Sequence, residues 1–234
     1  MILDVRNIQT FYGESQALQG VTLQLDEGET VCILGRNGAG KSTTLKSIMG
    51  LTPPRSGEVI FDGKPVPGPP AHQIARAGIG QDAEDRRIFP GLSVRDNLEV
   101  ASYQRKGSAA RWTVDGILKK YEMLGERADQ DGATLSGGQQ QRLAVARSLM
   151  IQPRLLLLDE PNEGLAPVIV QQIGELIDDL SKTTTILFTD QSVQFALKHA
   201  RRAYILEKGQ VVHEAPSDEL RKDQATQDRF LSVA

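Results

Sequence analysis

The sequence has few cysteines, few aromatic residues and no long hydrophobic run. Its 234 residues include one cysteine, Cys32, which excludes a disulfide framework and lies in an apolar stretch where we expect a buried, inert thiol. No unbroken apolar run is longer than residues 155–158, whereas a membrane-spanning helix needs about 20 such residues. The N-terminal residues lack a signal-peptide pattern. We therefore expect a cytoplasmic protein.

An excess of basic residues is also missing. The sequence has 27 Lys and Arg against 30 Asp and Glu, a formal net charge of −3. Proteins that bind nucleic acids usually carry a basic patch, so we expect no nucleic-acid partner. A hydrophobic content of 39% and a charged content of 24% supply a globular core and exclude a disordered or fibrous chain.

Short β-type runs alternate with helical patterns, which predicts an α/β fold with a mostly parallel core sheet. The runs that predict its central strands are residues 30–34, 155–158 and 185–189. Alternating apolar and polar residues over 2–8 and 21–25 predict a small antiparallel β flank, which 59–61 can join.

From Ser93 to about Met150 the patterns are helical, which predicts an inserted α-helical subdomain. Ser93 and Asp96 have the spacing of a capping box at its first helix. We interpret the chain as a single domain. Its predicted parts are a core formed by 1–84 and 151–215, a helical subdomain over 85–150 and a C-terminal tail over 216–234.

Residues 35–42 match the phosphate-binding pattern G-x-x-x-x-G-K-[ST] between a predicted strand and a predicted helix. Glycines let backbone N–H groups converge on an anion, and the helix start adds the positive end of its dipole. Lys41 can reach the β- and γ-phosphates, and Ser42 can ligate Mg²⁺. The pattern predicts a nucleotide site formed by Gly35, Arg36, Asn37, Gly38, Ala39, Gly40, Lys41, Ser42 and Thr43.

Two adjacent carboxylates follow the predicted strand 155–158. Asp159 emerges at the carboxyl end of this strand, where its carboxylate can bind a water molecule on Mg²⁺. Glu160 is placed to polarise a water for attack on the γ-phosphorus. We predict that Asp159 belongs to the Mg²⁺ site and that Glu160 is a catalytic residue.

Residues 135–139 read Leu-Ser-Gly-Gly-Gln and precede the acidic strand. With the two motifs above, they resemble the signature of ABC transporter ATPases, which implies a P-loop NTPase fold with a RecA-like core and ATP with Mg²⁺ as its cofactors. The resemblance implies that the signature loop contacts ATP held by a second ABC ATPase subunit, either a copy or a sister chain. The residues it assigns there are Ser136, Gly137, Gly138 and Gln139. It also implies that Tyr12 stacks on adenine, with Phe11 as a rival.

Two positions depart from the usual family pattern. The resemblance places Glu84 where the family has a sensor of Mg²⁺ and the attacking water, and Gln81 competes for this role. Gln81 and Asp82 also weaken the strand expected there. Gln191 occupies the position of a histidine that faces the γ-phosphate. Its amide can donate a hydrogen bond but cannot carry a positive charge.

Residues 84–94 and 163–167 are similar to ATPase subunits of bacterial importers for branched-chain amino acids, and of relatives handling urea or short amides. This similarity implies integral membrane permease subunits as partners, a periplasmic solute-binding protein acting indirectly, and a location at the inner face of the cell membrane. The solute is not encoded in this chain. Two alternatives stay open, the ATPase of a lipid or lipopolysaccharide export system and a soluble ABC ATPase outside transport.

Overall fold

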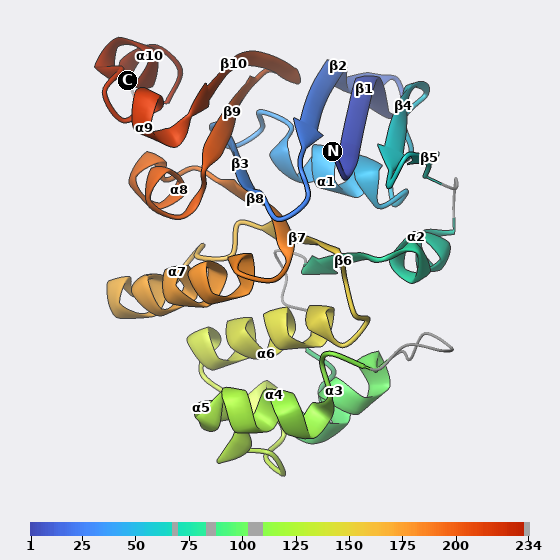
Figure 1. Cartoon of the computed structure of the whole chain (residues 1–234), viewed down its shortest axis with the longest axis vertical. Coiled ribbons are helices and arrows are strands. Elements are labelled where there is room, and N and C mark those ends of the chain that lie inside the picture. The colour runs from blue at the N-terminus through green and yellow to red at the C-terminus, as the bar shows by residue number, and fades with distance from the viewer. Residues whose placement is uncertain (67–69, 83–87, 103–109, 232–234) are drawn as a thin grey trace.

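Two β-sheets form one end of the molecule, and a group of helices forms the other (Figure 1). The computed structural model describes residues 1–66, 70–82, 88–102 and 110–231. Its strands are β1 (Leu3–Tyr12), β2 (Ser15–Leu25), β3 (Thr30–Leu34), β4 (Ser56–Phe61), β5 (Lys64–Pro65), β6 (Ile79–Asp82), β7 (Leu155–Asp159), β8 (Thr185–Asp190), β9 (Arg202–Glu207) and β10 (Gln210–Pro216). Its helices are α1 (Lys41–Ile48), α2 (Ala71–Ala77), α3 (Val94–Ala101), α4 (Val114–Lys120), α5 (Glu122–Gly125), η1 (Gly132–Thr134), α6 (Gly137–Leu149), α7 (Pro167–Ser181), α8 (Val193–His199), α9 (Ser217–Leu220) and α10 (Gln224–Phe230).

The larger sheet has the strand order β10-β9-β3-β8-β7-β6. Its pairings are parallel from β9 to β6, and only the outer pair β9–β10 is antiparallel. This confirms the predicted α/β class with a mostly parallel core sheet. The strand that Gln81 and Asp82 weaken in the sequence is present, because β6 pairs with β7 in register from Ile79 to Asp82.

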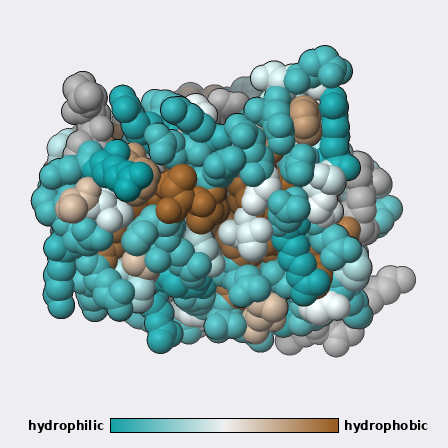
Figure 2. All heavy atoms as spheres, turned by 90° about the horizontal axis from the view of Figure 1, so that it is seen from above, coloured by the Kyte–Doolittle hydropathy of each residue, from teal (hydrophilic) through white to brown (hydrophobic). Residues whose placement is uncertain are grey.

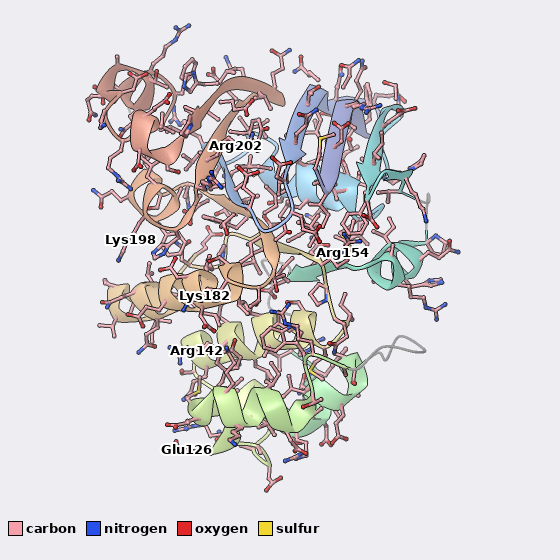
Figure 3. The ribbon with its side chains drawn as sticks, viewed as in Figure 1. Glu126, Arg142, Arg154, Lys182, Lys198 and Arg202 are labelled. Atoms are coloured by element: carbon pink, nitrogen blue, oxygen red, sulfur yellow. The ribbon has the colours of Figure 1, made fainter. Side chains whose placement is uncertain are left out.

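The smaller sheet is the predicted antiparallel flank. Its order is β2-β1-β4-β5, and Leu3 of β1 lies opposite both Leu25 of β2 and Phe61 of β4. Arg154, just before β7, joins this region to the core sheet (Figure 3). Its guanidinium donates to Asp62 Oδ2 at 2.6 Å and to Glu27 Oε1 at 3.1 Å.

Strand β7 is buried on both faces, which explains its run of leucines. Leu156 and Leu158 pack with apolar residues of α6 and α7, whereas Leu155 and Leu157 pack with the flank and with α1. The two hydrophobic clusters therefore lie on opposite faces of the core sheet. Cys32 is buried in the first cluster, as expected, and burial raises the pKa of its thiol.

The described elements between residues 94 and 149 are helices. The capping box is present, with Ser93 Oγ accepting from the Asp96 N–H at 3.0 Å and Asp96 Oδ2 accepting from the Ser93 N–H at 3.2 Å. Helix α6 contacts α3 and α5 on one side and β6 and β7 on the other, so it joins the helices to the core sheet. Helix α2, which follows Pro70, was not foreseen in the proline-rich stretch.

The surface seen from above is mostly hydrophilic, and apolar residues show in a narrow strip near its middle (Figure 2). Within the described ranges, no helix combines the length and the apolar character needed to cross a membrane.

Helices α7 and α8 meet at a buried histidine. The side chain of His199 is 3% exposed, and its Nδ1 lies 2.8 Å from Asp178 Oδ1 of α7. Its ring packs on Phe195, with centroids 4.7 Å apart. A Cβ added at Gly174 of α7 would lie 2.2 Å from His199 Nε2. The close packing of the ring therefore explains why a glycine stands inside this helix.

We therefore predict that Gly174→Ala lowers the free energy of unfolding by about 1–3 kcal/mol, because an added methyl group overpacks a site that holds the ring from two sides. Helix propensity alone predicts a gain of up to about 1 kcal/mol. Urea unfolding of the variant shows whether its free energy of unfolding is lower or higher than that of the wild type. The same change in a His199→Ala background is the control, and a stabilised single variant would contradict the packing argument.

Candidate nucleotide site

The loop 35–40 connects β3 to α1 and requires glycine at three places, of which Gly38 has φ +79°. Gly40 has φ +108°, a left-handed conformation that residues with a side chain rarely adopt. A Cβ at Gly35 would lie 2.5 Å from the carbonyl oxygen of Leu206. The loop is therefore held against β9, and it delivers Lys41 and Ser42 to the first turn of α1.

Lys41 is buried, with 3% of its side chain exposed, and its charge is balanced by oxygen atoms. Its Nζ forms an ion pair with Glu160 Oε1 at 2.9 Å. It also donates to the carbonyl oxygens of Gly35 at 2.8 Å and Arg36 at 3.2 Å. Phosphate oxygens are acceptors of the same kind, so they can replace the carboxylate at this ammonium.

Asp159 lies at the end of β7 and faces the first turn of α1. Its Oδ1 accepts from Ser42 Oγ at 3.0 Å and from Thr189 Oγ1 at 2.7 Å. Burial raises the pKa of Asp159, although the bonds from Thr189 and Ser42 oppose the shift. A hydroxyl and a carboxylate are hard oxygen ligands of the kind that Mg²⁺ prefers, and Mg²⁺ usually takes further oxygens from bound phosphates. The pair fits Mg²⁺.

Glu160 follows Asp159 in a left-handed backbone conformation with φ +45°. Its N–H donates to Thr189 Oγ1 at 2.9 Å, so one hydroxyl contacts both acidic residues. Thr189 was not singled out as a site residue, although its place at the end of a predicted core strand was a signal for it. Strained backbone at such a position is common in functional sites.

Lys41, Ser42 and Glu160 open onto a cleft of about 590 Å³, a size within the usual range for small-molecule sites. Asp159 and Thr189 lie behind them and do not line it. The lining residues are Ser15, Gln16, Ala17, Gln19, Asn37, Gly38, Gly40, Lys41, Ser42, Thr43, Glu160, Glu163 and Lys208. Sequence reasoning missed Lys208, which is one charged residue in a turn without a local pattern. It used Glu163 only as part of the importer-like segment 163–167, not as a residue of the cleft.

The signature loop lies apart from this cleft and lines none of it. Ser136 is exposed at the start of α6, and its N–H donates to Gln139 Oε1 at 2.9 Å. A Cβ at Gly138 would lie 2.5 Å from Ile169 Cγ2 of α7, so this glycine allows the two helices to approach closely. The structure therefore does not bring the two phosphate-binding motifs together within one chain.

A family model described as "ABC transporter" matches residues 18–163, more than half of the chain. The chain belongs to this family. The high-affinity branched-chain amino acid transport ATP-binding protein BraG of Pseudomonas aeruginosa is 38% identical over 231 residues, which cover 98% of this chain and 99% of BraG. The lipopolysaccharide export system ATP-binding protein LptB of Haemophilus influenzae is 32% identical over 234 residues, covering 98% of this chain and 97% of LptB. A dimeric post-hydrolysis state of the ATP-binding cassette MJ0796 with ADP and Pi has a TM-score of 0.81 and 28% identity, covering 92% of this chain and 99% of that one.

The chain is thus an ABC ATPase, a subunit that hydrolyses ATP for a transporter. ABC ATPases bind ATP, form dimers and work with membrane permeases. These findings confirm the predicted family and enzyme class.

The two aromatic candidates of this ABC ATPase for adenine have different surroundings. The Arg55 guanidinium covers the Phe11 ring at 4.2 Å from its centroid, whereas Tyr12 is 49% exposed at the β1–β2 turn. Partial burial acts to raise the pKa of Tyr12, but hydrogen bonds with Thr43 and Thr52 and the nearby Lys46 charge lower it. Tyr12 therefore lies beside Thr43 of the phosphate loop, and its role at adenine stays a prediction.

The residues predicted to sense Mg²⁺ or to face the γ-phosphate lie in different places relative to the nucleotide cleft. Glu84 lies outside the described residues, so its role stays a prediction. Gln81 lies in β6 and lines a second cleft rather than the nucleotide cleft. Gln191 is exposed directly after β8, and it does not line the nucleotide cleft in this structure.

A buried acid, Asp190, precedes Gln191 and was missed because it has no motif of its own. It is 1% exposed, and its Oδ1 accepts from the Ser192 N–H at 2.6 Å. Burial, together with the charge of Glu160, raises the pKa of Asp190 to about 7, against the lowering effect of backbone N–H groups. A residue beside Gln191 therefore titrates near neutrality, although glutamine itself does not.

We predict that Asp190 makes the folded protein less stable as the pH rises. The ordinary pKa of an aspartate is 3.8 and that of Asp190 in the folded chain is about 7, so the native state holds the extra proton between these values. Stability is then lost from about pH 4 to pH 7. Asp190→Asn removes this loss and keeps an acceptor for Ser192, so it should be more stable than wild type by on the order of 2–4 kcal/mol above pH 7.5. Urea unfolding from pH 5 to 8.5 tests this, and parallel curves for the two proteins would contradict it.

Proposed function

We propose that this ABC ATPase powers an importer for branched-chain amino acids, or for a related amide or urea. The observation that carries the proposal is the 38% identity to BraG along nearly the whole of both chains. The similar loop sequences at 84–94 and 163–167 agree with it. The likeness to LptB favours one alternative, the ATPase of a lipopolysaccharide export system.

In the proposed reaction, the phosphate loop and Lys41 bind the β- and γ-phosphates. Ser42 and Asp159 are the residues that would hold Mg²⁺, which neutralises phosphate charge when bound. When phosphate oxygens take the place of Glu160 at Lys41, the Glu160 carboxylate becomes free to accept a proton from the attacking water. This exchange makes the base available only when the phosphates are bound, because the ion pair of 2.9 Å otherwise occupies it.

Three further residues complete the proposed site. Gln191 donates a hydrogen bond to the γ-phosphate from the end of β8. Glu84 senses Mg²⁺ and the attacking water, as the resemblance implies. Tyr12 stacks on adenine, which its exposure and its place beside Thr43 support.

The working unit is proposed to be a head-to-tail dimer. The signature loop lies apart from the nucleotide cleft, so it can contact ATP bound to another subunit. Ser136, Gly137, Gly138 and Gln139 would then face the phosphate loop of that subunit. The dimeric state of the MJ0796 cassette supports this arrangement.

A second cleft is our proposed docking site for a permease subunit. It has a volume of about 320 Å³ and lies between the end of α1, α2, β6, α3 and α6. Leu51, in its lining, is 50% exposed. Docking here would place the chain at the inner face of the cell membrane, and a periplasmic solute-binding protein would act on the permease rather than on this chain.

Glu160→Gln is expected to bind ATP but to hydrolyse it at least about 100-fold more slowly, because an amide is a poor proton acceptor. A stable ATP-bound dimer should accumulate. Size-exclusion chromatography with light scattering measures the doubled mass. Adding Ser136→Arg should block this dimer and spare ATP binding by the monomer, and normal turnover of Glu160→Gln would remove Glu160 from the catalytic role.

Deletion of the gene in its own host cells tests the importer assignment. We expect reduced uptake of radiolabelled leucine or urea, restored by the wild-type chain but not by Glu160→Gln. Uptake of an unrelated sugar is the control. Unchanged uptake together with lipopolysaccharide retained in the inner membrane would favour the export alternative.

A further inference from the structure

Two buried polar side chains join the core sheet to the signature helix. Asp82, the last residue of β6, and Gln141, in the second turn of α6, are each 4% exposed. Gln141 Nε2 donates to Asp82 Oδ2 at 2.8 Å. Burying a carboxylate costs free energy unless hydrogen bonds compensate it, so this position needs its partner.

A second contact joins α6 to the chain beyond the described end of β6. The Arg147 guanidinium of α6 lies 4.3 Å from the centroid of the Phe89 ring. Asn97 of α3 fixes the Phe89 backbone, accepting from its N–H at 3.0 Å and donating to its carbonyl at 3.2 Å. Arg147 also interacts electrostatically with Asp82. Residues on both sides of segment 83–87 therefore contact the same helix.

Helix α7 holds a neighbouring part of the surface of α6. Arg142 donates to Gln172 Oε1 at 2.7 Å (Figure 3), and Gly138 lies against Ile169. Contacts on two parts of its surface fix the rotation of α6 about its own axis. Gln141 is five residues after Ser136, which is about 7.5 Å along a helix, so the rotation set at Gln141 is passed directly to the signature loop.

We propose that Asp82 and Gln141 are positioning residues for ATP hydrolysis, which set the signature loop in the orientation that closes on ATP of the second subunit. The inference rests on the ATP-bound dimer proposed above. An apolar pair of similar size would fill the same space, but it lacks the directional bond that fixes the angle between β6 and α6. Asp82 also precedes Glu84, the proposed sensor, by two residues in the sequence.

The test measures ATP-dependent dimerisation in the Glu160→Gln background. The main variant combines Asp82→Val with Gln141→Met, which removes both partners of the hydrogen bond together. We expect the ATP concentration for half-maximal dimerisation to rise about tenfold, as loss of one charged hydrogen bond allows. ATP affinity of the monomer, measured in the presence of Ser136→Arg, should stay within about twofold, since neither residue lines the nucleotide cleft.

Three further variants separate positioning from folding. Asp82→Asn keeps an acceptor for Gln141 and should dimerise like its parent. Gln141→Asn is shorter by one methylene and should give an intermediate shift. Gln152→Met is the matched control, because Gln152 bonds to the Trp112 backbone away from the signature loop, and it should leave dimerisation unchanged.

Urea unfolding of every variant reports its stability. If the double variant is less stable but dimerises at the parent's ATP concentration, the contact is merely structural and the positioning role is overturned. An equal shift in Gln152→Met would overturn it as well. If the Glu160→Gln parent itself stays monomeric with ATP, the proposed dimer fails, and the inference fails with it.

Discussion

The buried charge of Lys41 is the constraint on which the site depends. An ammonium group that is 3% exposed is costly to bury unless acceptors surround it, and the fold provides the Glu160 carboxylate and two loop carbonyls. These acceptors come from the carboxyl ends of β3 and β7, and parallel strands have their carboxyl ends at the same end of the sheet. The carbonyls belong to the loop itself, but the carboxylate is on a side chain and can be exchanged for phosphate. The charge that holds the loop together is therefore also the charge that selects the substrate.

The leucine alternation in β7 determines where the acidic residues lie. Leu155 and Leu157 face the cluster that contains α1, so the period of two places Asp159 on the same face, beside Ser42 in the first turn of that helix. The register Asp159↔Thr189 then brings the threonine hydroxyl between the two acids. A slip of one residue would turn Asp159 to the opposite face of the sheet. Hydrophobic packing thus fixes the geometry of the polar site.

Sequence patterns predicted the parts of this protein that are encoded locally. Each core strand, each strand of the antiparallel flank, the capping box at Ser93 and the phosphate loop was predicted from residues close together in the sequence, and the structure contains them all. Thr189 and Asp190 were missed because their importance comes from pairing with strands far away in the sequence. The Asp82–Gln141 bond joins residues 59 positions apart. Read locally, Asp82 was a polar residue that weakened a strand, and only the approach of α6 gives it a partner.

Strand β6 lies at the edge of the core sheet, so it has a neighbouring strand on one side only. Its end is therefore held by side chains of α6 as well as by β7, and the orientation of that helix depends on the same bond. Asp82 and Arg147 also line the second cleft, where we propose that a permease docks. A partner that presses on this cleft would act on the residues that orient the signature loop. In that arrangement, transport and hydrolysis are coupled through one short set of contacts between an edge strand and a helix, without a change in the phosphate loop itself.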